Sequence, residues 1–202
     1  MENTDKKQLS SHQFSDMYEK MDVDVDKLGC IMADVTPLQS MLFPEDDTNW
    51  MKKDLYTSDN PKHKWIKGWV VGKTAHITLL YGLMENGHTW KKYVNEVLEG
   101  WEMKTVEIDH IDYFESQYED EPYYCIVAHI KVTDKLLEGH ERLQFLPHID
   151  TFTGYKPHMT VAYIKKDKAR LDYHLKWMNK AWKGKRLNVE EGLNYGYKPG
   201  EK

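Results

Sequence analysis

One short pattern occurs twice in the sequence, and this repeat limits the folds open to the chain more than any other feature. Residues 72–81 read Gly-Lys-Thr-Ala-His-Ile-Thr-Leu-Leu-Tyr, and residues 154–163 read Gly-Tyr-Lys-Pro-His-Met-Thr-Val-Ala-Tyr. Aligned without gaps, the two segments share glycine, histidine, threonine and tyrosine at equivalent places, and both are apolar after the threonine. The repeat predicts two related halves, each delivering a His-x-Thr unit from a β-strand.

The spacing within each unit has a geometric meaning. Side chains at positions i and i+2 of a strand point to the same face of the sheet. His76 and Thr78 therefore project together, as do His158 and Thr160, while the apolar residues between them turn toward a core. If the two strands lie side by side about a pseudo-twofold axis, these four polar side chains meet in one cleft.

The pair of units is far more specific than either unit alone. The chain has ten histidines, and only these two are followed by serine or threonine two residues later. About one such unit is expected by chance in a chain of this size. A single unit would indicate no more than a histidine bonded within its strand, whereas two in matching apolar segments indicate a shared site.

Two imidazoles and two hydroxyls are suited to phosphodiester cleavage. The reference pKa of histidine, about 6.5, lets one ring accept a proton from the attacking oxygen while the other protonates the departing oxygen. Threonine hydroxyls can donate hydrogen bonds to the non-bridging phosphate oxygens. We therefore predict His76, Thr78, His158 and Thr160 as catalytic residues that need no metal or other cofactor. Which histidine is the acid stays open at this point.

On these residues the chain resembles the 2H phosphoesterase superfamily over roughly residues 28–190. The resemblance implies an α+β, bilobal fold in which two antiparallel sheets form a central cleft with helices outside. The segments flanking the two histidines most resemble those of phage anti-CBASS phosphodiesterases, which destroy cyclic di- and trinucleotide messengers of bacterial immunity. That likeness implies cleavage of 3′,5′ linkages, as in cyclic GMP-AMP. It also implies a cytoplasmic location, which for a phage-encoded protein is the cytoplasm of the host cell.

The same resemblance implies a substrate-binding stretch near the C-terminus. The phage enzymes hold bases by aromatic stacking and use a carboxylate there, which would correspond to Glu191, Tyr195 and Tyr197. The alternative is an exposed tail without a role. Residues 36–63 depart from the compact enzymes and are expected to form a long loop or insertion that could act as a lid.

Other functions remain open beside the first. The chain could be an RNA 2′,3′-cyclic or 2′,5′-oligoadenylate phosphodiesterase, or a module that sequesters a nucleotide without turnover. A metal site built from His140, His148 and His158 fits no zinc spacing, and no His-Glu-x-x-His helix is present, so we predict no metal. A serine-hydrolase interpretation fails because the nucleophile-elbow pattern is missing.

The composition limits the partners. The formal net charge is −5, from 28 basic and 33 acidic residues, which argues against binding to long nucleic acids. Residues 156–186 nevertheless hold ten lysines or arginines and two aspartates, which indicates either a lysine-covered helix face or a local field that attracts a small phosphorylated ligand. No apolar stretch is long enough to cross a bilayer, and we expect no secretory signal. Cys30 and Cys125 are expected to be buried free thiols in a reducing compartment.

The pattern also predicts the order of elements. Residues 1–27 are expected to be a polar extension with a helix at 11–21, residues 28–192 the two-lobed domain, and residues 193–202 a tail. We expect strands at 29–35, 75–83, 105–114, 123–132, 157–164 and 186–190, and helices at 88–99, 134–145 and 171–182. Strands that come in neighbouring pairs favour antiparallel sheets. The oligomeric state is left open.

Overall fold

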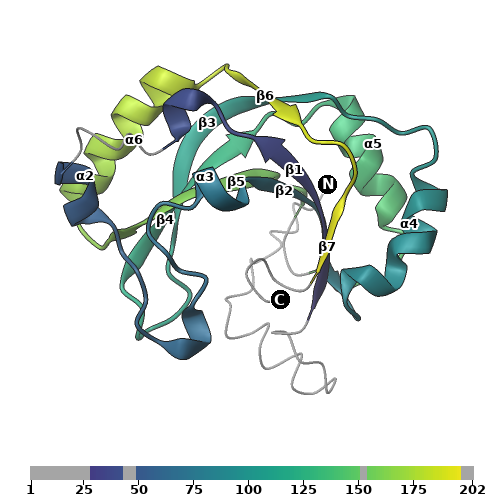
Figure 1. Ribbon diagram of the computed structural model, residues 1–202, viewed down its shortest axis with the longest axis horizontal. Coiled ribbons are helices and arrows are strands. Elements are labelled where there is room, and N and C mark those ends of the chain that lie inside the picture. Colours follow the sequence, from purple (N-terminus) through teal and green to yellow (C-terminus); the bar gives the residue numbers. More distant parts are fainter. Residues whose placement is uncertain (1–27, 43–48, 151–153, 197–202) are drawn as a thin grey trace, which may run out of the picture.

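The computed structural model describes residues 28–42, 49–150 and 154–196. Within these ranges the chain forms strands and helices in mixed order, which confirms the α+β class (Figure 1). The strands are β1 (Gly29–Thr36), β2 (His76–Leu83), β3 (Thr105–Glu115), β4 (Tyr123–Ile130), β5 (His158–Lys165), β6 (Arg186–Val189) and β7 (Asn194–Gly196). The α-helices are α2 (Asn49–Asp54), α3 (Val71–Thr74), α4 (Lys91–Val97), α5 (Asp134–Leu143) and α6 (Lys168–Trp182), and short 3-10 turns are η2 (Gln39–Met41), η3 (Pro61–His63) and η4 (Gly87–Trp90).

All seven strands belong to one antiparallel sheet of order β2-β1-β6-β3-β4-β5, with β7 also paired to β1. Strand β6 pairs with the end of β1 on one side and the start of β3 on the other. The two sheets expected from the sequence are therefore two halves of a continuous sheet: β1, β2 and β7 form one half, and β3, β4 and β5 form the other. Figure 1 shows this sheet as an arch.

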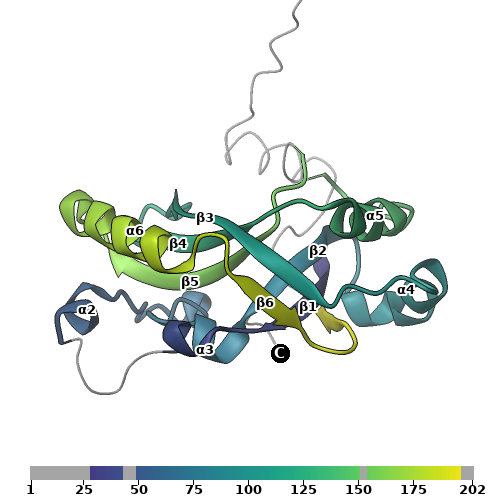
Figure 2. The same ribbon diagram turned by 90° about the horizontal axis from the view of Figure 1, so that it is seen from above.

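The helices lie outside the sheet at its two ends, as expected. Helix α6 contacts β3, whereas α5 contacts β2 and is itself contacted by α4 (Figures 1 and 2). The two longer helices begin at capping residues that the sequence supplies: the Asp167 side chain accepts a hydrogen bond from the Arg170 amide (3.1 Å), and Thr133 accepts one from the Leu136 amide (3.2 Å). Such caps satisfy amides that have no partner within a helix.

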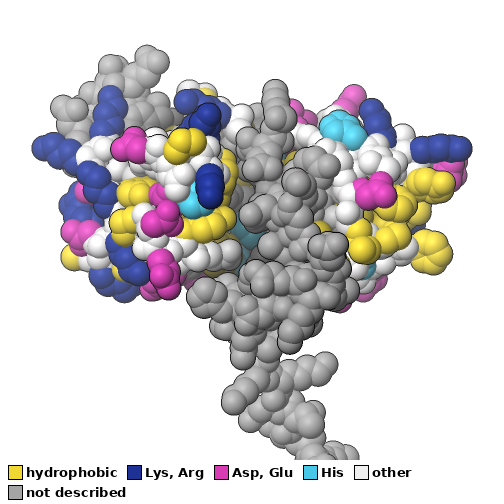
Figure 3. Space-filling model, turned by 90° about the horizontal axis from the view of Figure 1, so that it is seen from below, with side chains coloured by type: hydrophobic (Ala, Val, Ile, Leu, Met, Phe, Trp, Pro, Cys, Tyr) yellow, Lys and Arg dark blue, Asp and Glu magenta, His cyan; other side chains and the backbone are white. Residues whose placement is uncertain are grey.

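A single large core draws on both halves of the sheet, and includes Ile31, Ile77, Ile126, Met159 and Trp182. A smaller apolar cluster lies on the other face of β4 and β5, where Ile66 and Val70 cover Tyr123, Cys125 and Tyr163. On α6 the apolar positions Leu171, Met178 and Trp182 are buried while its lysines stay exposed, which matches a lysine-covered helix face. Figure 3 shows more Lys and Arg side chains over the half that holds α2 and α6 than over the other half.

Two segments differ from the prediction. Residues 36–63 are not simply a loop, because they contain η2, α2 and η3, and the Tyr56 amide donates to the Tyr163 carbonyl (2.9 Å). The segment expected to be a C-terminal tail contributes β7. Strand β7 is paired with β1, and Tyr56 is bonded to β5; both contacts join residues distant in sequence, which a local pattern does not reveal. The predicted extension 1–27, with its helix at 11–21, lies outside the described residues.

Candidate active site

The two His-x-Thr units begin the two strands that end the sheet order. Strand β2 starts at His76 and β5 starts at His158. These two strands contact each other near the middle of the arch (Figure 1). The residue three positions before His158 contributes to this contact, because the Tyr155 hydroxyl donates a hydrogen bond to the Thr78 carbonyl (3.1 Å). The second motif is thus bound to the strand of the first.

The expected alternation along both strands is confirmed. Ile77 and Met159 are fully buried and belong to the same core. The histidine and threonine of each unit are half-buried, at alternate positions of β2 and β5. Since successive side chains of a strand point to opposite faces, all four polar side chains point away from that shared core. We call the face that carries them the histidine face.

Both motif histidines are held by the same local hydrogen bond. The Nδ1 atom of His76 lies 2.6 Å from the Thr74 carbonyl oxygen, and that of His158 lies 2.9 Å from the Lys156 carbonyl oxygen. A carbonyl oxygen can only accept, so Nδ1 carries the proton and Nε2 of each neutral ring keeps its lone pair. The two motifs are therefore alike in side-chain geometry as well as in sequence. In both of them the Nε2 atom is available for proton transfer.

Burial lowers the pKa of both imidazoles. For His76 the Thr74 carbonyl and the charge of Asp34 oppose the effect of burial, while the charge of His158 lowers the pKa further. For His158 only the Lys156 carbonyl opposes burial. The Asp34 carboxylate therefore favours the protonated form of His76, whereas no carboxylate has a corresponding effect on His158.

A histidine outside the motifs supports the strand of the first motif. His140 of α5 donates from Nδ1 to the Leu79 carbonyl (2.7 Å), and its ring stacks on Tyr155 with centroids 3.9 Å apart. His140 and Tyr155 therefore join α5, β2 and the loop before β5. Sequence reasoning did not find this role, because it depends on contacts between three distant segments.

Both cysteines are buried free thiols, as predicted. Burial raises the pKa of Cys30 to about 12, and it raises that of Cys125 to about 12 although a hydrogen bond with Thr160 acts in the opposite direction. A thiol with so high a pKa stays protonated and is a poor nucleophile. The histidine pair therefore has no competing thiolate nucleophile from these two residues.

Of the predicted substrate-binding residues, the described part of the chain includes Tyr195 and Glu191. Tyr195 is 7% exposed, is paired in register with Ile31, and points its hydroxyl toward Asn95 (3.4 Å), so its ring packs into the core. This placement does not test the predicted stacking role of Tyr195, which stays a prediction. Glu191 is exposed in the turn between β6 and β7, where its role stays a prediction, and Tyr197 lies outside the described residues.

Two further histidines extend the histidine face beyond the motifs. His129 of β4 pairs in register with His158, with ring centroids 6.2 Å apart, and His110 of β3 stacks on His129 at 4.5 Å. The Phe114 ring meets His158 edge-on at 5.0 Å. The sequence pattern indicates only that His110 falls in an alternating strand.

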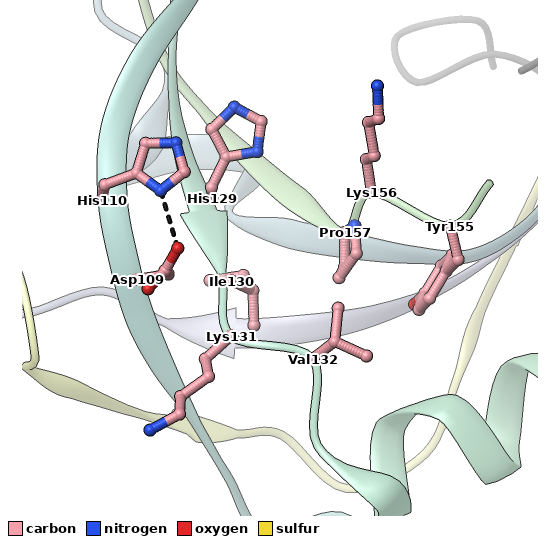
Figure 4. A pocket seen from close by; sticks show the side chains of 9 residues that line it. All are labelled: Asp109, His110, His129, Ile130, Lys131, Val132, Tyr155, Lys156 and Pro157. Carbon is pink, nitrogen blue, oxygen red and sulfur yellow. Dashed lines mark hydrogen bonds and ion pairs between the residues drawn. The ribbon is translucent and has the colours of Figure 1, made fainter. Parts of the chain in front are cut away.

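A pocket of about 260 Å³ lies beside His129 (Figure 4). Its walls combine imidazoles, lysines and apolar side chains, and they include the two residues before His158. The lining residues are Asp109, His110, His129, Ile130, Lys131, Val132, Tyr155, Lys156 and Pro157. The pocket adjoins the His158 end of the candidate site.

The paired units and the α+β fold define the class of site found in 2H phosphoesterases. The model of the 2′-5′ RNA ligase superfamily matches residues 61–192, which include both units and cover well over half of the chain. The chain therefore belongs to the 2′-5′ RNA ligase superfamily. Membership supports phosphodiester chemistry as its class of reaction.

Comparison with solved structures gives more distant likenesses. The structure of Kluyveromyces marxianus Usb1 is 10% identical, with a TM-score of 0.44, over 86% of this chain and 99% of that one. The structure of Kluyveromyces marxianus Usb1 with uridine monophosphate is 9% identical, with a TM-score of 0.43, over 86% and 100%. No curated protein matches the chain. Among the described residues, no helix is both long and apolar enough to cross a membrane.

Proposed function

We propose that the chain is a metal-independent phosphodiesterase that cleaves 3′,5′ linkages in small cyclic oligonucleotides. His76 and His158 act as the acid–base pair, and Thr78 and Thr160 bind the phosphate. The observation that carries the proposal is the matched hydrogen bond of the two rings, each fixed through Nδ1 to the carbonyl two residues earlier, on one face of one sheet. This leaves two equivalent Nε2 atoms for two proton transfers.

The charge of Asp34 assigns the roles of the two histidines within this proposal. A carboxylate near an imidazole favours the charged ring, so we assign His76 as the acid and His158 as the base. The ribose 2′-hydroxyl gives its proton to Nε2 of His158 as its oxygen bonds to phosphorus. The bond from phosphorus to the 5′ oxygen breaks, and His76 protonates that oxygen. The products are a 2′,3′-cyclic phosphate, which water can then open, and a 5′-hydroxyl.

The two threonines supply hydrogen bonds to the phosphate in this scheme. Each hydroxyl lies on the same strand face as its histidine, two residues further on. As negative charge on the non-bridging oxygens increases, donors fixed in place stabilise it without reorganising. Removal of one such donor typically lowers kcat by about 10²–10³-fold.

The substrate assignment rests on the sequence flanking the histidines. Their likeness to anti-CBASS enzymes favours cyclic di- or trinucleotide messengers, such as cyclic GMP-AMP, as the small partner and the cytoplasm of an infected bacterium as the setting. The acidic net charge is in keeping with a small substrate rather than a long nucleic acid. The family description names 2′-5′ RNA ligases, which is in keeping with RNA 2′,3′-cyclic phosphates and 2′,5′-oligoadenylates as the second candidates.

A substrate panel distinguishes these candidates. Purified protein is incubated, with and without EDTA, with cyclic GMP-AMP, cyclic di-AMP, 2′,5′-oligoadenylate and an RNA 2′,3′-cyclic phosphate, and the products are separated by chromatography. Cleavage of the cyclic dinucleotides, unchanged by EDTA, is the expected result. If only 2′,5′-oligoadenylate or the RNA 2′,3′-cyclic phosphate is cleaved, the cyclic-oligonucleotide assignment is wrong and the second candidates replace it. Recovery of an intact bound nucleotide after heat release, with no cleavage, replaces catalysis by sequestration.

A further inference from the structure

Three side chains on the histidine face have no part in the proposed reaction. His110 of β3 lies directly opposite His129 of β4, and Asp112 is two residues beyond His110 on the same strand. Opposite residues of an antiparallel pair have Cβ atoms about 5 Å apart, and i+2 shares the face. The ligand atoms of all three residues lie within 4.8 Å of one another.

A fourth residue orients one of the three. The β3–β4 register shifts between Ile108 and His110, so Asp109 has no opposite partner. Its carboxylate instead accepts a hydrogen bond from Nδ1 of His110 at 2.8 Å, drawn as the dashed line in Figure 4. A carboxylate that fixes one imidazole nitrogen and leaves the other available is the usual second partner of a metal-bound histidine. The bulge therefore prepares Nε2 of His110 as a ligand.

We propose that His110, His129 and Asp112 bind one divalent cation of the Zn²⁺ type. Two imidazoles and one carboxylate favour late first-row metals over Mg²⁺ and Ca²⁺, which prefer oxygen ligands. In tetrahedral coordination with bonds of about 2.1 Å the ligand atoms lie about 3.4 Å apart, so groups that are now within 4.8 Å must move closer. The stacked rings of His110 and His129 must also turn until one nitrogen of each points at the ion. Three protein ligands leave a position open to water or to a phosphate oxygen.

A second group of possible ligands is less suited to a metal. His63, Asp120 and Glu121 also lie close together, but the buried Glu121 carboxylate already accepts hydrogen bonds from Tyr56 (2.7 Å), Ser58 (2.5 Å) and His63 (2.9 Å). Binding a cation there would break that network. In the first group, the Asp112 carboxylate accepts a hydrogen bond from the Tyr113 amide (2.9 Å) through Oδ1, so a cation bound at Oδ2 leaves that bond intact.

The cation site uses none of the four residues proposed for catalysis, although His129 is the neighbour of His158. The ion has no role in the two proposed proton transfers, and its binding is measured in the absence of substrate. A chain without phosphodiesterase activity could still bind the ion, and a chain that binds no ion could still cleave its substrate. The two proposals therefore fail separately.

Calorimetric titration of Zn²⁺ into the metal-stripped, untagged 202-residue chain tests the site. One ion per chain is expected for the wild type. His129→Gln and Asp112→Asn should each weaken binding more than tenfold, and Asp109→Asn, which changes only the orienting carboxylate, by about 10–100-fold. The matched control is His88→Gln, an exposed histidine of η4, which should bind as the wild type does.

Circular dichroism verifies that each variant is folded. If a histidine variant does not fold, Asp109→Asn and Asp112→Asn still test the site, because asparagine has nearly the same shape as aspartate. Visible absorption of a Co²⁺ complex provides a second measurement, since ligand-field bands report histidine coordination. Absence of Zn²⁺ binding by the wild type overturns the proposal. So does binding that survives His129→Gln unchanged, or binding that is lost in His63→Gln and retained in His129→Gln.

Discussion

Replacement of either motif histidine by alanine should remove most cleavage and leave the fold intact. The His158 ring packs against Phe114 on the side of β5 that faces away from the core, and its Nδ1 donates a hydrogen bond to a neighbouring carbonyl. Losing such a bond costs about 0.5–1.5 kcal/mol of stability. The loss of an acid or base typically costs about 10²–10⁴-fold in rate. At about 1.36 kcal/mol per tenfold, that is about 3–5 kcal/mol of transition-state stabilisation.

The double variant extends the test. Two groups that act in one step are not additive, because the second removal acts on a reaction already without concerted proton transfer. The combined loss for His76→Ala with His158→Ala should therefore be smaller than the product of the two single losses. Initial rates are measured by chromatography on whichever substrate of the panel is cleaved, with circular dichroism to verify folding.

His148 offers a matched control for both substitutions. Its Nδ1 also donates to the carbonyl two residues earlier, that of Leu146, at 2.7 Å, but no threonine follows it two residues later. His148→Ala should keep nearly full activity. Either motif variant retaining more than a tenth of the wild-type rate would refute the assigned acid–base pair.

Three further outcomes follow from the same structure. Burial lowers the pKa of both His76 and His158, so both limbs of the kcat/KM profile of the free enzyme should lie below the ordinary value of about 6.5. The rate then falls as pH rises and the acid loses its proton, and an optimum above about pH 7.5 would contradict the assigned pair. Glu121→Ala should cost about 1–3 kcal/mol in urea unfolding, because three partly buried donors lose an acceptor carboxylate that is 2% exposed. Exposed Glu119→Ala is its control, and equal stability of the two variants would remove the buried carboxylate from the explanation. Gly139→Ala should cost about 1–3 kcal/mol, because the new Cβ would lie 2.5 Å from a ring atom of Trp101; an unchanged melting temperature argues against this.

The sequence predicts best those elements in which apolar residues recur at regular intervals. Strands β2 and β5 have apolar residues at alternating positions and begin within one residue of the predicted start. Strand β7 was missed because it has three residues and depends on pairing with β1. The same pairing places Tyr195, since the register with Ile31, rather than the tyrosine itself, decides which face of the sheet the ring occupies.

The residues of the candidate sites also differ in whether the sequence alone could identify them. A repeated His-x-Thr is visible in one dimension, so the four proposed catalytic residues could be selected from sequence. His110 and His129 could not, because their proximity depends on the β3–β4 register, and the orienting role of Asp109 on a one-residue shift in that register. Strand pairing brings together residues that are distant in sequence, and no local pattern encodes which ones.

The four residues of β6 hold the two halves of the sheet together through two pairs with β1 and three with β3. Neither motif lies on this strand, yet it joins the half that carries His76 to the half that carries His158, so the spacing of the two imidazoles depends on it. Substitutions that weaken β6 should therefore depress turnover before helix or strand content declines. Under the proposed mechanism, the cleavage rate therefore depends on the pairing of a strand that carries neither histidine.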